Sequence, residues 1–341
     1  MSSLGPLEEK EIKVAETDIK SVKVAAIQAP NYFGNIEKNK IHFTNLIRQA
    51  ADKGAKIIVL PEAALTGYAS VDFKKTWFIR GRDKWTDSKR FDSLINPLEY
   101  AQDKDDSSMI KHFQTLCREL SIYCTIPFVE KKKKEYNVNN KYITTTTTTF
   151  EAQYFPYHEW TFYNSVSLIN PKGDVIAHYR KTNLWPYYDF AWCTYGKDIV
   201  TAETEYGKVG LGICFDVHKI LPEYKKENIW TLLYCIAWMS GCHRAGDEKT
   251  YFWFRNQLSK KLFEEQVPYF VIGSNWSVPS SPSSYLIEDL KVDKDNTNTK
   301  KSTKSSNTLK ESPKSPHMYD WAGGGYSTIY SPYTGQEKEE K

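Results

Sequence analysis

Short apolar runs alternate along this chain with longer segments whose apolar residues recur at helical spacing. The run at 56–60 is almost wholly apolar, which is typical of a strand that is buried on both faces. The segment 35–53 has the spacing of a helix, and Gly54 follows it as a stop signal. We expect five of its apolar side chains to share one face: Ile36, Ile41, Phe43, Leu46 and Ile47.

The same alternation continues over most of the sequence. Further strands are predicted at 24–28, 122–130, 166–170, 174–179, 231–237 and 269–274. Further helices are predicted at 107–120, 221–228 and 247–266. Strands that alternate with helices in this way predict an α/β layered domain.

Three segments break the pattern. Residues 1–20 are acidic and polar, and we expect a mobile N-terminal arm. The segment 131–149 combines a lysine run with a threonine run, which favours an extended hairpin or an exposed loop. Residues 279–316 are rich in Ser, Thr, Asn, Lys and Pro, so we expect a disordered insertion there. The segment 318–332 then resumes the strand pattern and is expected to return to the sheet, which leaves one domain over 21–335.

Composition narrows the class of protein. With 341 residues, of which 40% are hydrophobic, the chain can bury a sizeable core. Its formal net charge of +4 is modest, and the lysine-rich stretches at 131–134 and 291–314 are typical of solvated loops, so no nucleic-acid partner is expected. No run approaches the ~20 apolar residues of a membrane span, and we expect no membrane association. Residues 1–20 lack the apolar stretch of a signal peptide, so a cytoplasmic location is expected unless a leader is missing.

The cysteines are spaced for neither disulfides nor metal. None of the six forms a C-x-x-C pair or a zinc-type spacing: Cys117, Cys124, Cys193, Cys214, Cys235 and Cys242. Several lie in apolar runs, which suits reduced thiols in a reducing compartment. We therefore expect no structural metal.

Three strand ends carry side chains of complementary chemistry. Cys214 follows one apolar run, Glu62 follows another, and Lys181 ends a third. Taken alone, a cysteine after an apolar strand is most often a small buried hydrophobe. An acid, an amine and a thiol together indicate acyl transfer from a C–N bond instead.

The chemistry assigns a role to each of these residues. Glu62 would act as general base and draw the proton from Cys214. Lys181 would lower the pKa of the thiol, because a nearby ammonium favours the thiolate. The thiolate would attack an amide or nitrile carbon, and Lys181 with the backbone N–H of Phe215 would hold the oxyanion. This scheme needs no metal and no organic cofactor.

These segments resemble the nitrilase superfamily of carbon–nitrogen hydrolases. The resemblance extends from 23–29 to 268–275. Its main motifs are Pro61-Glu62-Ala63-Ala64-Leu65-Thr66-Gly67-Tyr68, Tyr163-Asn164-Ser165, Tyr179-Arg180-Lys181 and Gly212-Ile213-Cys214-Phe215-Asp216. The resemblance implies a four-layer α-β-β-α sandwich and assembly as a homodimer or higher homo-oligomer.

Some details resemble the biotinidase and vanin (pantetheinase) branch of this superfamily. The matching stretches are 180–184, 214–216, 237–239 and 325–332. The resemblance implies a small-molecule linear amide as substrate, with pantetheine or a biotin amide as the first class to test. ω-Amidase, ureidopropionase-type and protein N-terminal amidase activities are alternatives. A non-catalytic binding protein that retains the fold and an N-acyltransferase are two further readings.

One position departs from the family pattern. Members commonly place a second glutamate seven or eight residues after the lysine, where it orients the lysine. Here those positions are Tyr188 and Asp189, so Asp189 could serve with a shorter arm, or Glu130 or Glu159 could reach in. By their places beside the motifs, four residues are expected to bind substrate: Tyr163, Asn183, Asp216 and Trp238.

Overall fold

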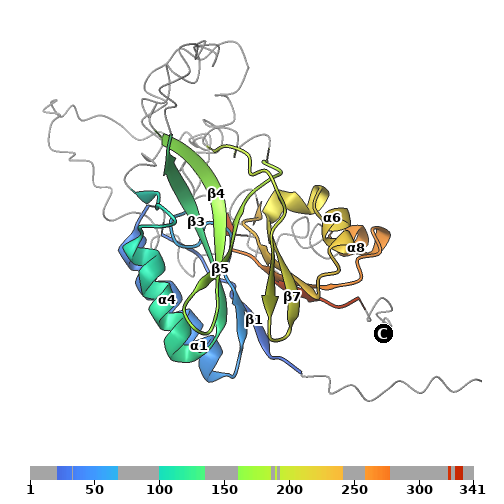
Figure 1. The fold of residues 1–341 in the computed structure, drawn as a ribbon, viewed down its shortest axis with the longest axis horizontal. Coiled ribbons are helices and arrows are strands. Elements are labelled where there is room, and N and C mark those ends of the chain that lie inside the picture. The colour runs from blue at the N-terminus through green and yellow to red at the C-terminus, as the bar shows by residue number, and fades with distance from the viewer. Residues whose placement is uncertain are drawn as a thin grey trace, which may run out of the picture.

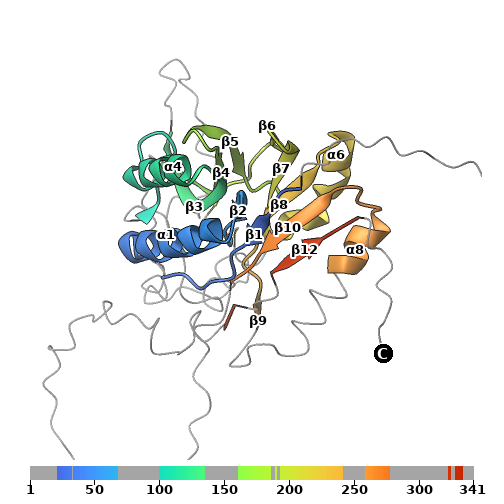
Figure 2. The ribbon, with the colours of Figure 1, turned by 90° about the horizontal axis from the view of Figure 1, so that it is seen from below.

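Two five-stranded sheets lie face to face, and helices cover both outer sides (Figures 1 and 2). This computed structural model describes residues 21–32, 34–67, 100–134, 160–185, 189, 193–240, 258–276, 322–323 and 327–332. The first sheet has the order β1-β2-β3-β4-β5, formed by Val24–Ala26, Ile57–Val59, Tyr123–Lys133, Trp160–Ile169 and Val175–Arg180. The second has the order β12-β10-β8-β7-β6, formed by Thr328–Tyr330, Phe270–Ser274, Thr231–Cys235, Gly207–Ile213 and Thr201–Thr204. A short ladder pairs β9 (Met239–Ser240) with β11 (Ala322–Gly323).

Helices α1 (Ile36–Asp52) and α4 (Ser108–Leu120) cover the outer face of the first sheet (Figure 2). Each begins at a polar cap: Asn35 Oδ1 accepts from the Lys38 N–H, and Ser107 Oγ accepts from the Ile110 N–H. Five apolar residues were expected on one buried face of α1. The expectation is wrong for Ile41, because its side chain is 61% exposed. It lies five residues after Ile36, which turns it about 140° away from that residue around the helix.

Three apolar cores separate the four layers. Between the sheets, side chains such as Val59, Leu211, Leu233 and Ile272 are at most 1% exposed. The outer face of the second sheet packs against α6 (Leu221–Lys226) and α8 (Ser259–Glu264). The predicted four-layer α-β-β-α sandwich is therefore the observed architecture.

The strand ends that carry the candidate chemistry meet where the two sheets face each other. Glu62 follows β2 of the first sheet, and Cys214 directly follows β7 of the second. The Glu62 N–H donates to the Ile236 carbonyl just beyond β8, at 3.1 Å, which ties the two sheets together at this edge. Chain ends of parallel strands gather at one edge of a sheet, so this placement follows from the topology.

Most of the remaining elements follow the sequence pattern with shifted bounds, but β6 was not predicted, and residues 247–257 of the helix expected at 247–266 lie outside the described residues. β3 continues to Lys133, and β4 begins at Trp160, so these two strands are longer than predicted. β12 pairs antiparallel with β10, which confirms the predicted return of the C-terminal segment to the sheet. The expected arm at 1–20, most of 131–149 and the insertion at 279–316 lie outside the described residues. Within the described part of the chain, no helix is both long and apolar enough to cross a membrane.

Candidate active site

Cys214 lies on a strained turn at the end of β7. Its φ of +42° falls in the left-handed region, which costs a non-glycine residue on the order of 1–3 kcal/mol. The turn continues as a 3-10 helix, η3 (Cys214–His218), and the Tyr234 hydroxyl donates to the Cys214 carbonyl. Cys214 is partly exposed, whereas the four other cysteines that the structure describes are buried. The strained turn and the partial exposure of Cys214 suit a residue that reacts more than one that only packs.

Glu62 presents one oxygen that is engaged and one that is not. Its Oε1 accepts from Asn164 Nδ2 at 2.7 Å and from Lys181 Nζ at 2.8 Å. Its Oε2 is buried and has no hydrogen-bond partner among the described residues. A buried acceptor without a donor costs about 1–3 kcal/mol, so Oε2 is available to accept a proton. The Glu62 carbonyl accepts from Trp276 Nε1 at 2.8 Å, which fixes the backbone at this point.

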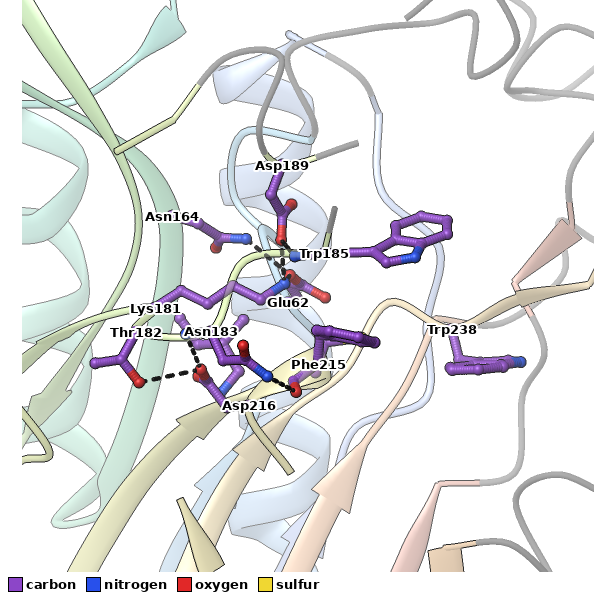
Figure 3. Close-up of polar contacts among 12 residues, drawn as sticks. Glu62, Asn164, Lys181, Thr182, Asn183, Trp185, Asp189, Phe215, Asp216 and Trp238 are labelled. Atoms are coloured by element: carbon purple, nitrogen blue, oxygen red, sulfur yellow. Dashed lines mark hydrogen bonds and ion pairs between the residues drawn. The ribbon is translucent and has the colours of Figure 1, made fainter. Parts of the chain in front are cut away.

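Lys181 lies between two carboxylates (Figure 3). Its Nζ is 2.8 Å from Glu62 Oε1 and 2.6 Å from Asp189 Oδ2, and the side chain is 1% exposed. Burial lowers the pKa of Lys181, but Asp189 and Glu62 raise it, and the net result lies well above the ordinary value. The amine therefore stays an ammonium.

Lys181 lowers the pKa of the Cys214 thiol, as expected, but two other influences outweigh it. Burial raises the pKa of Cys214, and the neighbouring Glu62 carboxylate raises it further, while Lys181 lowers it by less. The pKa consequently lies well above its usual range, and the resting residue is a protonated thiol. A base must then take the proton as the thiol attacks, because the ammonium alone does not produce a thiolate.

Of the candidate acids for the second carboxylate, the structure brings Asp189 to Lys181. Asp189 is fully buried, and its Oδ2 also accepts from the Trp185 N–H at 2.9 Å. Burial raises the pKa of Asp189 above its ordinary value, although Lys181 lowers it. A carboxyl one carbon shorter than glutamate thus reaches the ammonium. Glu159 lies outside the described residues.

Glu130 belongs to a different cluster, so its expected place beside the lysine is wrong. Its carboxylate accepts from Arg180 Nε at 2.8 Å and from Ser165 Oγ at 2.6 Å, and it pairs with His178 Nε2 at 3.0 Å. Adjacent strand residues point to opposite faces of a sheet. Arg180 therefore binds Glu130 on one face of the sheet, while the side chain of Lys181 lies on the other face and binds Glu62.

Tyr163 lies on the same face as Glu130. The two residues are directly opposite each other in the β3–β4 ladder, and the Arg180 guanidinium lies 3.9 Å from the centre of the Tyr163 ring. Its neighbour Asn164 points the other way and binds Glu62. The motif named both residues, but only the strand register decides which of them faces the site. Asn164 is the functional residue that the sequence reasoning missed.

Two more expected substrate contacts are occupied within the protein. Asp216 is fully buried and accepts hydrogen bonds from the Ile213 N–H and the Asn183 N–H, at 2.9 and 2.8 Å. Asn183 Nδ2 donates to the Phe215 carbonyl at 2.9 Å. Both side chains therefore join protein segments to each other. Their expected contact with substrate stays a prediction, and the hydrogen bonds that the structure describes for the fully buried Asp216 are all internal.

Aromatic side chains lie to one side of the carboxylates. In Figure 3, Trp185, Phe215 and Trp238 are placed on the side of the site opposite the Lys181 stem. The Trp238 N–H donates to Asn275 Oδ1 at 2.7 Å, which fixes the backbone that carries this indole. Of these rings, Trp238 was expected to bind substrate, whereas Phe215 was expected only for its backbone N–H and Trp185 was not expected.

Comparison with known proteins places these features in a family. The model of a family described as carbon–nitrogen hydrolase matches residues 23–221. Human Pantetheine hydrolase VNN2 is 26% identical over 197 residues, which is 57% of this chain and 34% of that protein. Omega-amidase NIT3 from Saccharomyces cerevisiae is 21% identical over 211 residues, which is 58% of this chain and 56% of that protein. The chain thus spans only a third to just over half of the length of these curated relatives.

The fold is also similar to solved structures. The crystal structure of S. cerevisiae Nit3, described as a member of branch 10 of the nitrilase superfamily, superposes with a TM-score of 0.50. The sequence identity is 16%, and the match covers 76% of this chain and 77% of that one. At this identity the likeness speaks for the fold alone.

Proposed function

Because this chain belongs to the carbon–nitrogen hydrolase family, we propose that it hydrolyses the C–N bond of a linear amide through a cysteine thioester. One observation carries the proposal: Lys181 is held between Glu62 and Asp189 beside the strained turn of Cys214. A buried acid with a free oxygen, an ammonium and an accessible thiol are the groups that this reaction requires.

The first half of the reaction forms the acyl-enzyme. Glu62 Oε2 takes the proton of Cys214 as the sulfur attacks the amide carbon. The carbonyl oxygen becomes an oxyanion, which the Lys181 ammonium and the Phe215 N–H stabilise. The C–N bond then breaks, Glu62 returns the proton to the leaving nitrogen, and the acyl group remains on sulfur as a thioester.

The second half releases the acid. Glu62 accepts a proton from water as the water oxygen attacks the thioester carbon, and the same two donors hold the second oxyanion. The C–S bond breaks, the carboxylic acid leaves, and the proton returns to the sulfur of Cys214. Asp189 keeps Lys181 charged and in place throughout.

The relatives suggest which amides to try first. One is named for pantetheine hydrolysis, one for ω-amidase activity, and a third, from Schizosaccharomyces pombe, for protein N-terminal amidase activity. We propose pantetheine and biotin amides as the first panel, with ω-amides, ureidopropionate-type compounds and peptides suited to a protein N-terminal amidase as the second. We further propose that the protein acts as a homodimer or higher homo-oligomer in the cytoplasm, where a free thiol stays reduced.

A substrate screen tests the proposal. Release of amine or ammonia from each amide is measured with the wild type, with Cys214→Ala and with Glu62→Gln. We expect at least one amide to be cleaved by the wild type and by neither variant. Cys117→Ala, which changes a buried cysteine remote from the site, serves as the matched control and should retain turnover. Undiminished cleavage by Cys214→Ala would remove the thioester mechanism.

A further inference from the structure

A single buried carboxylate receives hydrogen bonds from both segments that carry the catalytic chemistry. Asp216 Oδ1 accepts from the Asn183 N–H at 2.8 Å and from Thr182 Oγ1 at 3.4 Å. Asp216 Oδ2 accepts from the Ile213 N–H at 2.9 Å and from the Tyr179 hydroxyl at 2.7 Å. Oδ1 thus binds the segment after Lys181, whereas Oδ2 binds both the strand end before Cys214 and Tyr179 of β5, the strand that leads into Lys181.

A second bond runs between the same two segments in the opposite direction. The side chain of Asn183 donates through Nδ2 to the carbonyl of Phe215, at 2.9 Å. Figure 3 shows this reciprocal arrangement, with Asp216 directed at Thr182 and Asn183, and Asn183 directed at Phe215. The two segments come from different sheets, so these bonds lock one sheet edge to the other beside the site.

We propose that Asp216 and Asn183 are positioning residues that hold the ammonium of Lys181 in register with the thiol of Cys214. This inference rests on the proposed function and adds to it the groups that set its geometry. Asn183 lies two residues after Lys181, and Asp216 lies two residues after Cys214. Neither side chain contacts Glu62 or Asp189 through a hydrogen bond that the described structure contains.

The hydrogen bonds to Asp216 depend on the charge of its carboxylate. The titratable and charged groups that face it come from three neighbouring elements: Tyr179 and Lys181 at the end of β5, Tyr224 of α6 and Tyr234 of β8. Burial raises the pKa of Asp216 to about 6, although Lys181 and three hydrogen-bonded neighbours lower it. A protonated Asp216 carries a hydrogen on one oxygen and can no longer accept from all four donors. Asp216 therefore accepts all four hydrogen bonds only above about pH 6.

The pH profile of turnover separates positioning from a general loss of structure. In the wild type we expect an acid limb with a midpoint near pH 6, as Asp216 takes up a proton. In Asp216→Asn this limb should vanish, and kcat should fall on the order of 10²-fold with KM unchanged, because a misplacement of about 1 Å costs this much. Asp174→Asn, the same substitution at an exposed position, should keep both the limb and the rate.

A second variant covers the outcome in which Asp216→Asn does not fold. Asn183→Ala leaves the buried carboxylate in place and removes only the bond to Phe215. We expect it to lower kcat by about tenfold or more without changing KM, since the lost bond acts on geometry alone. Normal kcat in Asn183→Ala, or an acid limb near pH 6 that persists in Asp216→Asn, would overturn the proposal.

Alkylation of Cys214 tests the positioning when no substrate is known. The rate constant for iodoacetamide labelling is measured by peptide mass spectrometry in the wild type, Asp216→Asn and Asn183→Ala. We expect both variants to react at least about tenfold more slowly, because the Lys181 ammonium, which lowers the pKa of the thiol, is no longer held beside it. Equal rates in all three would overturn the positioning role, whereas slower labelling without cleavage of any amide would leave the positioning standing and remove the proposed function.

Discussion

Lys181 and Asp189 form a buried ion pair in which Nζ lies 2.6 Å from Oδ2. The aspartate follows the lysine by eight residues, and the two side chains are 1% and 0% exposed. A buried ion pair loses most of its benefit to desolvation, but removing one partner leaves an uncompensated charge. Since Lys181 also binds Glu62, the loss of Asp189 would change both the charge and the position of the ammonium.

Substitution of Asp189 should therefore reduce catalysis. We expect Asp189→Asn to lower kcat on the order of 10²-fold, because the ammonium loses its second anchor. Asp189→Glu, which restores the residue type that the family commonly uses, should retain more activity than Asp189→Asn. Asp198→Asn, an exposed aspartate nearby in the sequence, is the control. Normal turnover of Asp189→Ala in the same steady-state assay would exclude Asp189 from the mechanism.

Gly196 presses against the backbone that leads into Lys181. Its N–H donates to the Lys181 carbonyl at 2.8 Å, and a Cβ at this position would lie 1.9 Å from the Arg180 carbonyl oxygen. Gly196→Ala must displace that peptide, so we expect a loss of roughly 1–3 kcal/mol in the free energy of unfolding and a lower kcat. Urea unfolding and steady-state kinetics measure the two effects.

A second glycine provides the matched control. Gly54 has a φ of +88° at the end of α1, and a Cβ there would meet nothing closer than the Lys23 ammonium nitrogen at 3.5 Å. Gly54→Ala should cost about 1 kcal/mol through backbone strain with kcat unchanged. If both variants lower kcat in proportion to their loss of stability, Gly196 has no specific role in holding the lysine.

Glu130 makes the fold sensitive to acid. Burial raises the pKa of Glu130, but hydrogen bonds from Arg180, His178 and Ser165 lower it. The net pKa is about 2, compared with an ordinary pKa of 4.5. A depressed carboxyl pKa stabilises the fold fully above pH 4.5, and this contribution is lost as the pH falls toward 2. The shift corresponds to on the order of 3 kcal/mol.

Unfolding experiments on Glu130→Gln test this contribution. At pH 7 the variant should be less stable than the wild type by roughly 3–5 kcal/mol, because Arg180 remains without its partner. The difference should shrink as the pH is lowered from 5 toward 3, when the wild-type carboxylate loses its advantage. A stability difference that stays constant over this range would contradict the assigned ion-pair network.

Asp216 should affect stability in the opposite direction. Its pKa is raised by burial from 3.8 to about 6, so its contribution is full below pH 3.8 and is lost as the pH rises through 6. The loss amounts to on the order of 3 kcal/mol. Relative to Asp216→Asn, which does not titrate, the wild type should therefore lose stability between pH 4 and pH 7. Urea unfolding of both proteins at these two pH values measures this loss. A wild type that gains stability relative to Asp216→Asn as the pH rises would be inconsistent with the raised pKa.

The sequence predicted the fold more completely than it predicted the site. Alternating apolar runs predicted most of the strands and helices. The expected helices at 35–53 and 107–120 begin at Asn35 and Ser107, which are the cap residues of α1 and α4 in the structure. The side-chain directions could not be predicted, because they depend on strand register. Tyr163 and Asn164 are adjacent in one motif, yet only Asn164 faces Glu62.

The roles beside the motifs also needed three dimensions. Asp216 and Asn183 follow the cysteine and the lysine at short distances, which suggested contact with substrate, but their partners come from the opposite segment. The pKa of Cys214 likewise depends on burial and on Glu62, neither of which a sequence motif conveys. Asp189 was one of three acids that the family resemblance suggested, because members commonly place a glutamate at this distance after the lysine; the structure decides among them.

The central claim is that Cys214 carries the acyl group during turnover. Intact-protein mass spectrometry of enzyme quenched in acid during steady-state cleavage of a linear amide tests it most directly. The account predicts a mass increase equal to the acyl group, located on the peptide that contains Cys214 and absent from Cys214→Ala. Product formation at the wild-type rate by Cys214→Ala, with no adduct on either protein, would contradict it.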